Sequence, residues 1–139
     1  MRANLLSNLK NQLSNLNLEG YIIPKNDEYF NEYVSKSNDR LKFISNFSGS
    51  AGFAVILKNK NYLFVDGRYT IQAKIESGRK FTVITIPQKY PKDVLPTKKK
   101  IKIGFDPKLH NEKQLNFLFN IKNIDLVPIK KKFNRYYLV

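Results

Sequence analysis

Cysteine is absent from the 139 residues of this chain, and histidine occurs once, as His110. Without thiols there is neither a disulfide framework nor a thiolate site. A metal centre needs clustered His, Asp, Glu or Cys side chains. One histidine and eleven scattered carboxylates show no such cluster in the sequence. A catalytic centre contained within this chain is therefore not expected.

Long hydrophobic runs are also missing. No apolar run approaches the ~18 residues of a membrane-spanning helix, and the first ten residues lack the apolar core of a signal peptide. The length fits one domain with a core of its own. The simplest interpretation is one cytoplasmic domain without a membrane partner.

Acidic residues are few, with 11 Asp and Glu against 25 Lys and Arg, which gives a net charge of +14. Such a charge can indicate binding to nucleic acid or to an acidic membrane. The chain has 20 Lys, 16 Asn and only 5 Arg, however, and proteins that recognise bases favour Arg for its bidentate fork. AT-rich coding bias and incidental surface charge are the favoured explanation. Nucleic-acid binding through the lysine runs 98–100 and 130–132 is the weaker alternative.

What the chain does contain is an alternation of helical and strand patterns, which predicts an α/β fold with a mixed sheet flanked by helices. The first helix is predicted over residues 2–17, with Leu5, Leu6, Leu9, Leu13 and Leu16 on one face and Glu19-Gly20 at its end. The segment 40–47 fits a helical turn or a short strand. Further helices are predicted over 26–34, 68–76, 92–95 and from Asn111, and strands over 21–23, 51–57, 62–65, 81–86, 101–105 and 124–127.

Residues 58–61 have the composition of a turn, so the strands 51–57 and 62–65 are predicted to form a hairpin. The stretch 47–52, which reads FSGSAG, adjoins this hairpin. It precedes a strand, whereas a phosphate-binding loop precedes a helix. A triad of Ser48 or Ser50 with His110 and Asp66 is disfavoured, because the G-x-S-x-G spacing is one residue short. We interpret Ser48, Gly49 and Gly52 as turn residues that admit the strand, and Gly67 as the residue of the next sharp turn.

The stretch 66–69, which reads DGRY, joins a strand to a helix. Asp66 can cap that helix, and Arg68 then lies at the carboxyl end of a strand, where α/β sheets present ligand-facing side chains. An Asp–Arg pair that only pins the turn explains the same residues equally well. Arg40 allows the same two interpretations, with the structural one favoured.

Together these motifs resemble the N-terminal, creatinase-type domain of aminopeptidase P (Xaa-Pro aminopeptidase). The resemblance covers roughly residues 5–130. It rests on FSGSAG at 47–52, DGRY at 66–69 and Gln72-Ala73, with support from Pro24, Asp27, Glu32-Tyr33, Arg40, GFDP at 104–107 and His110.

The resemblance implies a ribonuclease-H-like mixed sheet. In intact family members a second domain of pita-bread fold holds two metal ions, often manganese, and removes a residue that precedes proline. Its ligands (two Asp, one His and two Glu) have no counterparts here, so this chain is expected to hold no cofactor. The resemblance implies that Arg68 reaches toward the substrate or a partner subunit. Asp66, Tyr33 and Arg40 are the further candidates for residues that face the substrate or a partner.

Departures from the family pattern occur at three places. Tyr29 stands where many members have His, and Asn46 and Ser48 replace Gly and Thr; Asn46 still tolerates a left-handed turn. The segment 131–139 is a basic and aromatic tail without the acidic linker helix of the family. We therefore divide the chain into a creatinase-type domain, residues 1–130, and this tail, and expect a natural truncation before the catalytic domain.

The leading hypothesis is a non-catalytic domain that shapes substrate access and oligomer contacts for a metallopeptidase (hydrolase) catalytic domain. The chain alone is expected to be inactive. Its partners would be a separately encoded pita-bread domain or a second copy in a homodimer. The alternatives are a stand-alone interaction module and the inert relic of a truncated gene.

Overall fold

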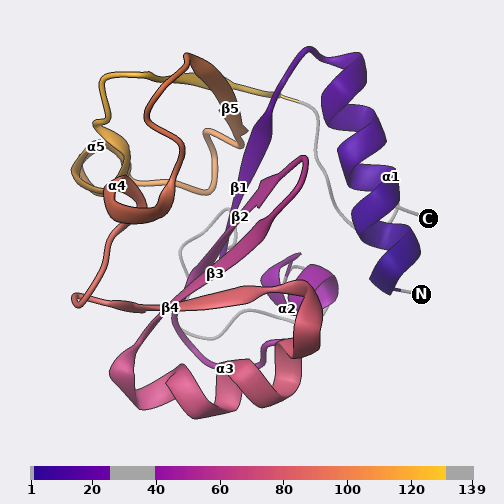
Figure 1. The fold of residues 1–139 in the computed structure, drawn as a ribbon, viewed down its shortest axis with the longest axis vertical. Coiled ribbons are helices and arrows are strands. Elements are labelled where there is room, and N and C mark those ends of the chain that lie inside the picture. Colours follow the sequence, from indigo (N-terminus) through magenta and orange to yellow (C-terminus); the bar gives the residue numbers. More distant parts are fainter. Residues whose placement is uncertain (1, 26–39, 131–139) are drawn as a thin grey trace.

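The computed structural model describes residues 2–25 and 40–130, and Figure 1 shows their arrangement. A six-stranded sheet has the order β4-β3-β2-β1-β5-β6. Its strands are β1 (Gly20–Pro24), β2 (Phe53–Leu57), β3 (Asn61–Asp66), β4 (Thr82–Ile86), β5 (Ile101–Phe105) and β6 (Ile124–Pro128). The helices are α1 (Arg2–Asn15), α2 (Arg40–Ser45), α3 (Thr70–Ser77), α4 (Pro91–Val94) and α5 (Glu112–Phe119), with 3-10 turns η1 (Gly67–Tyr69) and η2 (Gly78–Lys80).

The sheet is mixed, as the hairpin in the sequence predicts. Strand β2 is antiparallel to both neighbours, β1 and β3, whereas the pairs β3–β4, β1–β5 and β5–β6 are parallel. All strands except β2 therefore run in one direction. Their carboxyl ends, together with the start of β2, meet at a single edge of the sheet.

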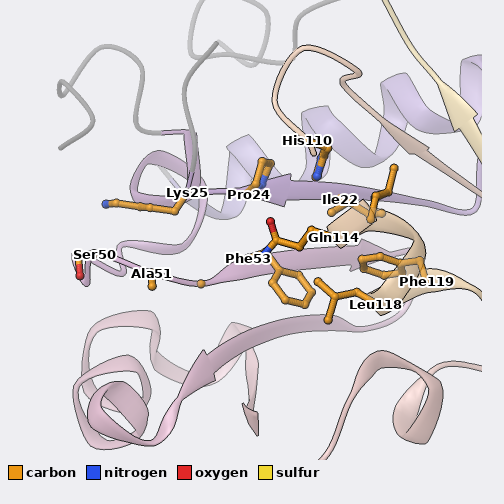
Figure 2. Close-up of a pocket in the computed structure, with 12 residues that line it drawn as sticks. Ile22, Pro24, Lys25, Ser50, Ala51, Phe53, His110, Gln114, Leu118 and Phe119 are labelled. Carbon is orange, nitrogen blue, oxygen red and sulfur yellow. The ribbon is translucent and has the colours of Figure 1, made fainter. Parts of the chain in front are cut away.

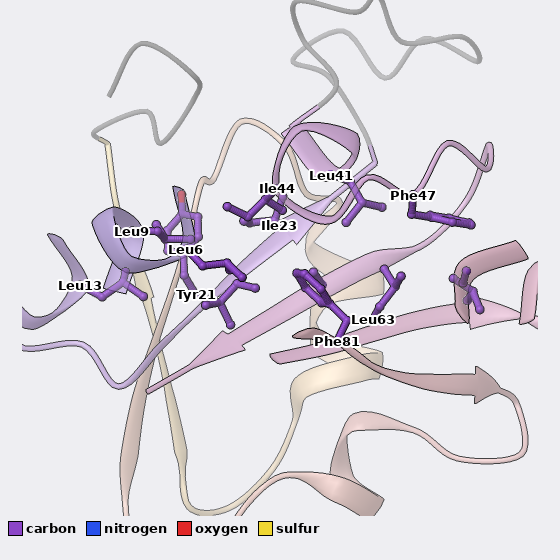
Figure 3. Close-up of a cluster of buried hydrophobic side chains, with 14 of the residues drawn as sticks. Leu6, Leu9, Leu13, Tyr21, Ile23, Leu41, Ile44, Phe47, Leu63 and Phe81 are labelled. Atoms are coloured by element: carbon purple, nitrogen blue, oxygen red, sulfur yellow. The ribbon is translucent and has the colours of Figure 1, made fainter. Parts of the chain in front are cut away.

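Each face of the sheet carries its own hydrophobic cluster, because successive side chains of a strand point to opposite faces. Helices α1, α2 and α3 cover one face, where Leu9, Ile44 and Ala73 pack against alternate strand residues such as Ile23 (Figure 3). Helices α4 and α5 cover the other face, where Leu95, Leu115 and Phe119 pack against Ile22 and Phe64. Figure 1 shows α1 and the pair α4–α5 on opposite sides of the sheet.

Helix α1 ends earlier than the sequence predicts, and the prediction that Glu19-Gly20 ends it is wrong. The helix stops at Asn15, and Asn17 takes the left-handed conformation with φ 59°. The Leu18 N–H donates to the Leu13 carbonyl, 2.9 Å away, which is the backbone pattern of a Schellman motif. Leu16, predicted on the buried face, is 43% exposed, and Leu18 is buried instead. Asn17 rather than Gly20 therefore ends the helix, and Gly20 belongs to β1.

The other elements of the described residues follow the predictions closely. The ambiguous segment 40–47 is helical over α2, and the connection after β4 contains the single turn α4. Gly78 ends α3 with φ 68°, and Asn111 caps α5 by accepting hydrogen bonds from two backbone N–H groups. The predicted helix over 26–34 and the tail 131–139 lie outside the described residues. Among the described helices, none has the length and apolar character needed to cross a bilayer.

Candidate functional site

The candidate site is the edge where the parallel strands end. Lys25 follows β1, the turn η1 follows β3, and the segment 106–110 follows β5. The loop 47–52 enters β2 at the same edge, since Phe53 pairs with Pro24. Loops at the carboxyl ends of strands are where α/β sheets place their ligand-binding side chains, so this edge brings together most of the predicted site residues.

Asp66 and Arg68 form the pair predicted at the turn after β3. The Asp66 Oδ1 accepts from the Arg68 backbone N–H at 2.9 Å, and the guanidinium donates from its Nε to Oδ1 at 3.2 Å and from an Nη to Oδ2 at 2.9 Å. These bonds hold the pKa of Asp66 below its usual range and raise that of Arg68. The Arg68 side chain is 74% exposed. The pair pins the turn and also holds a cation toward solvent.

The loop 47–52 behaves as a structural turn, as the sequence indicates. Phe47 is fully buried, and Gly49 lies directly over its ring, where an added Cβ would come within 2.2 Å of Cζ. Gly52 has φ 148° and its carbonyl accepts from the Lys25 N–H at 3.1 Å. Asn46 has φ 68°, which confirms the left-handed turn expected there.

Ser48 ties this loop to the end of α3. Its backbone N–H donates to Glu76 Oε1 at 2.8 Å, its hydroxyl bonds to both Glu76 oxygens, and Gln72 Nε2 donates to the hydroxyl at 3.1 Å. Partial burial raises the pKa of Glu76, but the hydrogen bonds from Ser48 and Gln72 together bring it below its usual value. Sequence reasoning missed Glu76, although its spacing of four from Gln72 places both on one side of a helix.

The remaining predicted residues have different outcomes. Arg40 begins α2. Burial and the negative charge of Asp106 raise the pKa of Tyr21, and the positive charge of Arg40 partly opposes this shift. Gly67 opens η1 at the predicted turn, yet its φ is not positive and no heavy atom lies within 4 Å of an added Cβ, so the backbone there does not require glycine. Tyr33 lies outside the described residues.

The hydroxyls and carboxylates considered for a catalytic triad are not assembled into one. Ser48 bonds to Glu76, the Ser50 hydroxyl bonds to the Tyr69 hydroxyl, and Asp66 bonds to Arg68. His110 Nε2 is buried without a hydrogen-bond partner. In the described segments no three His, Asp or Glu side chains gather as metal ligands, so these residues do not fit the two-metal centre that the resemblance places in a second domain.

Comparison with known proteins decides the family. The sequence model of the Creatinase/Prolidase N-terminal domain matches residues 6–136. The chain belongs to this family. Its fold agrees, because the mixed sheet with flanking helices is that of creatinase-type domains.

Curated relatives match through part of this domain. Xaa-Pro aminopeptidase 2 of Rattus norvegicus is 44% identical over 69 residues, which are 50% of this chain and 10% of the relative. Aminopeptidase P1 of Arabidopsis thaliana is 36% identical over 84 residues, 59% of this chain and 13% of the relative. The matched region is thus a small part of these enzymes.

Solved structures show the same fold at lower identity. The X-prolyl aminopeptidase from Caenorhabditis elegans, described as a cytosolic enzyme with a di-nuclear active site, superposes with a TM-score of 0.76 at 23% identity, covering 96% of this chain and 25% of that one. The N-terminal domain of the cytoplasmic peptidase PepQ from Mycobacterium tuberculosis gives a TM-score of 0.66 at 21% identity, with coverage of 90% and 92%.

Proposed function

We propose that this chain acts as a non-catalytic domain of an Xaa-Pro aminopeptidase-like metallopeptidase, shaping substrate access and oligomer contacts for a catalytic domain. Two kinds of support converge. The family is that of domains attached to such peptidases, and the curated relatives are named for Xaa-Pro aminopeptidase activity. The strand-end edge of the sheet carries an oriented, exposed cation.

Arg68 is the observation that carries the proposal. Its guanidinium is fixed by Asp66 on one side and lies over the Tyr69 ring, 5.2 Å from the centroid. A guanidinium held by two bonds loses less entropy when it binds a carboxylate than a free side chain does. Arg68 would accordingly meet a peptide carboxylate or an acidic group of the partner at the mouth of the catalytic centre.

Helix α3 supplies an apolar surface next to this cation. Ile71 and Ile75 are each 76% exposed, and their spacing of four places them on one side of α3, which begins two residues after Arg68. Exposed apolar side chains that adjoin one another are typical of surfaces covered by a partner. The face formed by Arg68, Ile71 and Ile75 is the proposed contact for a catalytic domain or for a second copy.

Peptide hydrolysis tests the proposal. The purified 139-residue chain should not cleave an Xaa-Pro peptide when manganese is added, and metal-dependent turnover by the chain alone would contradict the proposal.

Co-expression with a metal-binding catalytic domain of an Xaa-Pro aminopeptidase should then restore cleavage. In the restored complex Arg68→Ala should lower kcat/KM about tenfold or more, as expected for the loss of a charged contact. Arg79→Ala, which removes an exposed arginine on η2, should leave it unchanged. Equal activity of the two variants would remove Arg68 from the proposal.

A further inference from the structure

Helix α5 carries an exposed aromatic side chain. Leu115, Leu118 and Phe119 of this helix pack toward the sheet, and the last two line a pocket of about 180 Å³ at the strand-end edge (Figure 2). Phe117 faces solvent instead and is 72% exposed. Among the large hydrophobic side chains that are exposed in the described residues, it is the only aromatic one. The packing of the described residues thus leaves a flat apolar ring open to a ligand.

Tyr90 holds the Phe117 ring in place. The two rings meet edge to face, with centroids 5.8 Å apart and an angle of 88° between their planes. Such pairs are a preferred arrangement of aromatic side chains. An edge-to-face contact covers at most one face of either ring, so Phe117 keeps a face that is free to stack on another planar group.

Four lysines follow the two helices that carry this aromatic pair. Residues 98–100 after α4 and Lys122 after α5 are exposed. The Asn123 side chain donates to the Pro96 carbonyl at 2.6 Å and to the Lys99 carbonyl at 2.9 Å, which ties the loop after α4 to the turn after α5. The aromatic pair joins the same two chain segments at the start of α4, and Figure 1 shows α4 and α5 side by side. We call the result the α4–α5 surface, which consists of Tyr90, Phe117, Lys98, Lys99, Lys100 and Lys122.

The positive charge of the α4–α5 surface is not neutralised by carboxylates of the described residues, because none of them forms an ion pair with the four lysines. Asp93 caps α4 through a hydrogen bond from the Tyr90 N–H at 2.9 Å, and Asp125 lies exposed on β6. The second lysine run of the sequence lies elsewhere, since Lys130 follows β6 whereas Lys100 precedes the parallel strand β5. Coding bias explains the number of lysines in the chain, but not an exposed aromatic pair beside four of them.

We propose that the α4–α5 surface binds single-stranded nucleic acid without reading its sequence. The lysines contact phosphates as point charges, and an unpaired base stacks on the open face of Phe117. An anionic membrane fits this surface less well, because the neighbouring exposed residues Lys113, Asn116 and Asn120 are polar and leave little apolar area to insert. The surface lies on the face of the sheet opposite to α3, so the proposal is independent of the role of Arg68.

Fluorescence anisotropy of the full chain with a labelled oligothymidylate of about 12 nucleotides tests the proposal. We expect a Kd below about 100 µM in about 50 mM KCl, and roughly 50-fold weaker binding in about 200 mM KCl, since about four phosphate contacts give a log–log salt slope near −3. A duplex of the same length should bind about tenfold more weakly, because its bases are already stacked. No binding in low salt, no dependence on salt, or duplex binding as tight as that of the single strand would overturn the proposal.

Two pairs of variants place the oligonucleotide on this surface. Phe117→Ala should weaken binding about tenfold without changing the salt slope, because it removes a stacking contact and no charge. Ile71→Ala, at a position on α3 that is similarly exposed, should leave the Kd unchanged. Equal Kd values for these two variants would contradict stacking on Phe117.

The second pair removes charge. Lys99→Gln/Lys100→Gln should reduce the salt slope by about 1.4. Lys74→Gln/Lys80→Gln removes the same charge from exposed positions elsewhere and should leave the slope unchanged. Equal losses in the two double variants would show a response to net charge alone and contradict the site. Sedimentation with phosphatidylglycerol vesicles completes the test, because binding to vesicles without binding to the oligonucleotide would assign the surface to a membrane and overturn the proposal.

Discussion

His110 links the stability of the fold to pH. Its pKa is about 4 in the folded chain against an ordinary value of 6.5, because burial disfavours the imidazolium. Between those values the unfolded chain binds a proton that the folded chain does not, so stability falls as pH decreases from about 6.5 to 4. Urea unfolding should show that the contribution of this residue to the free energy of unfolding falls by about 2–3 kcal/mol between pH 7 and pH 4.

The variant His110→Phe isolates this effect. Asp66 and Glu76, whose pKa values lie below their usual range, also lose stabilising interactions as pH falls. These carboxylates remain in the variant, so its stability should still decrease with acid but less steeply than that of the wild-type chain. Parallel pH curves for the two proteins would show that the folded His110 titrates normally.

Gly49 and Gly67 differ in the space that is available for a side chain. A Cβ at Gly49 would meet three atoms of the buried Phe47 ring at 2.2–2.9 Å, whereas a Cβ at Gly67 meets nothing within 4 Å. Gly49→Ala should lower the free energy of unfolding by about 1–3 kcal/mol, as overpacking does. Gly67→Ala should be neutral or stabilising by up to about 1 kcal/mol. Denaturant titration of the two variants checks the contrast, and equal effects would contradict it.

Sequence patterns anticipated the residues whose roles are local and missed those whose roles depend on distant partners. Asp66 capping its own turn and the left-handed Asn46 follow from neighbouring residues alone. The carboxylate of Glu76 meets Ser48 across 28 positions of sequence, and no local pattern records such a contact. The unpartnered Nε2 of His110 is likewise a property of the packed core, because burial decides it.

At the scale of elements, α5 is the support of the pocket. Asn111 caps it through Oδ1, which accepts from Lys113 N–H at 2.9 Å and Gln114 N–H at 3.4 Å. Asn111→Ala should destabilise the chain by about 1 kcal/mol, because two backbone donors lose their acceptor. Asn116→Ala, at an exposed position within the same helix, should be neutral or slightly stabilising. Thermal unfolding of both variants measures the difference, and a cap variant as stable as the wild type would contradict it.

Element boundaries were predictable where a single residue dictates the backbone. Gly78 and Asn111 mark the ends of their helices because each acts through its own conformation or side chain. The end of α1 was misplaced, since Asn17 serves as the left-handed residue where a glycine was expected three positions later. Segment 40–47 stayed open from sequence alone, because a short apolar pattern fits both the helical and the strand period, and tertiary packing decides between them.

At the scale of the whole molecule, the order of the strands places motifs that are distant in the sequence at one edge of the sheet. The sequence predicts a mixed α/β sheet, but the adjacency of β1 and β5 arises from segments about 80 residues apart. Because β1 and β5 are paired, the segment 106–110 that follows β5 lies beside Lys25 and the loop 47–52. The family resemblance supplies the fold class, whereas the pocket follows only from the assembled topology.

The last prediction concerns the α3 face as a contact for a second copy. The double variant Ile71→Ser/Ile75→Ser removes two side chains that are 76% exposed, so the free energy of unfolding should change by less than about 0.5 kcal/mol. If the chain forms a homodimer through this face, light scattering should show a mass that rises with concentration for the wild type and stays monomeric for the double variant. Lys74→Ser, at an exposed position on the same helix, should associate like the wild type. A wild-type mass that stays monomeric at every concentration would contradict the homodimer. A catalytic domain would then be the remaining partner for this face, and the double variant should weaken binding of that domain.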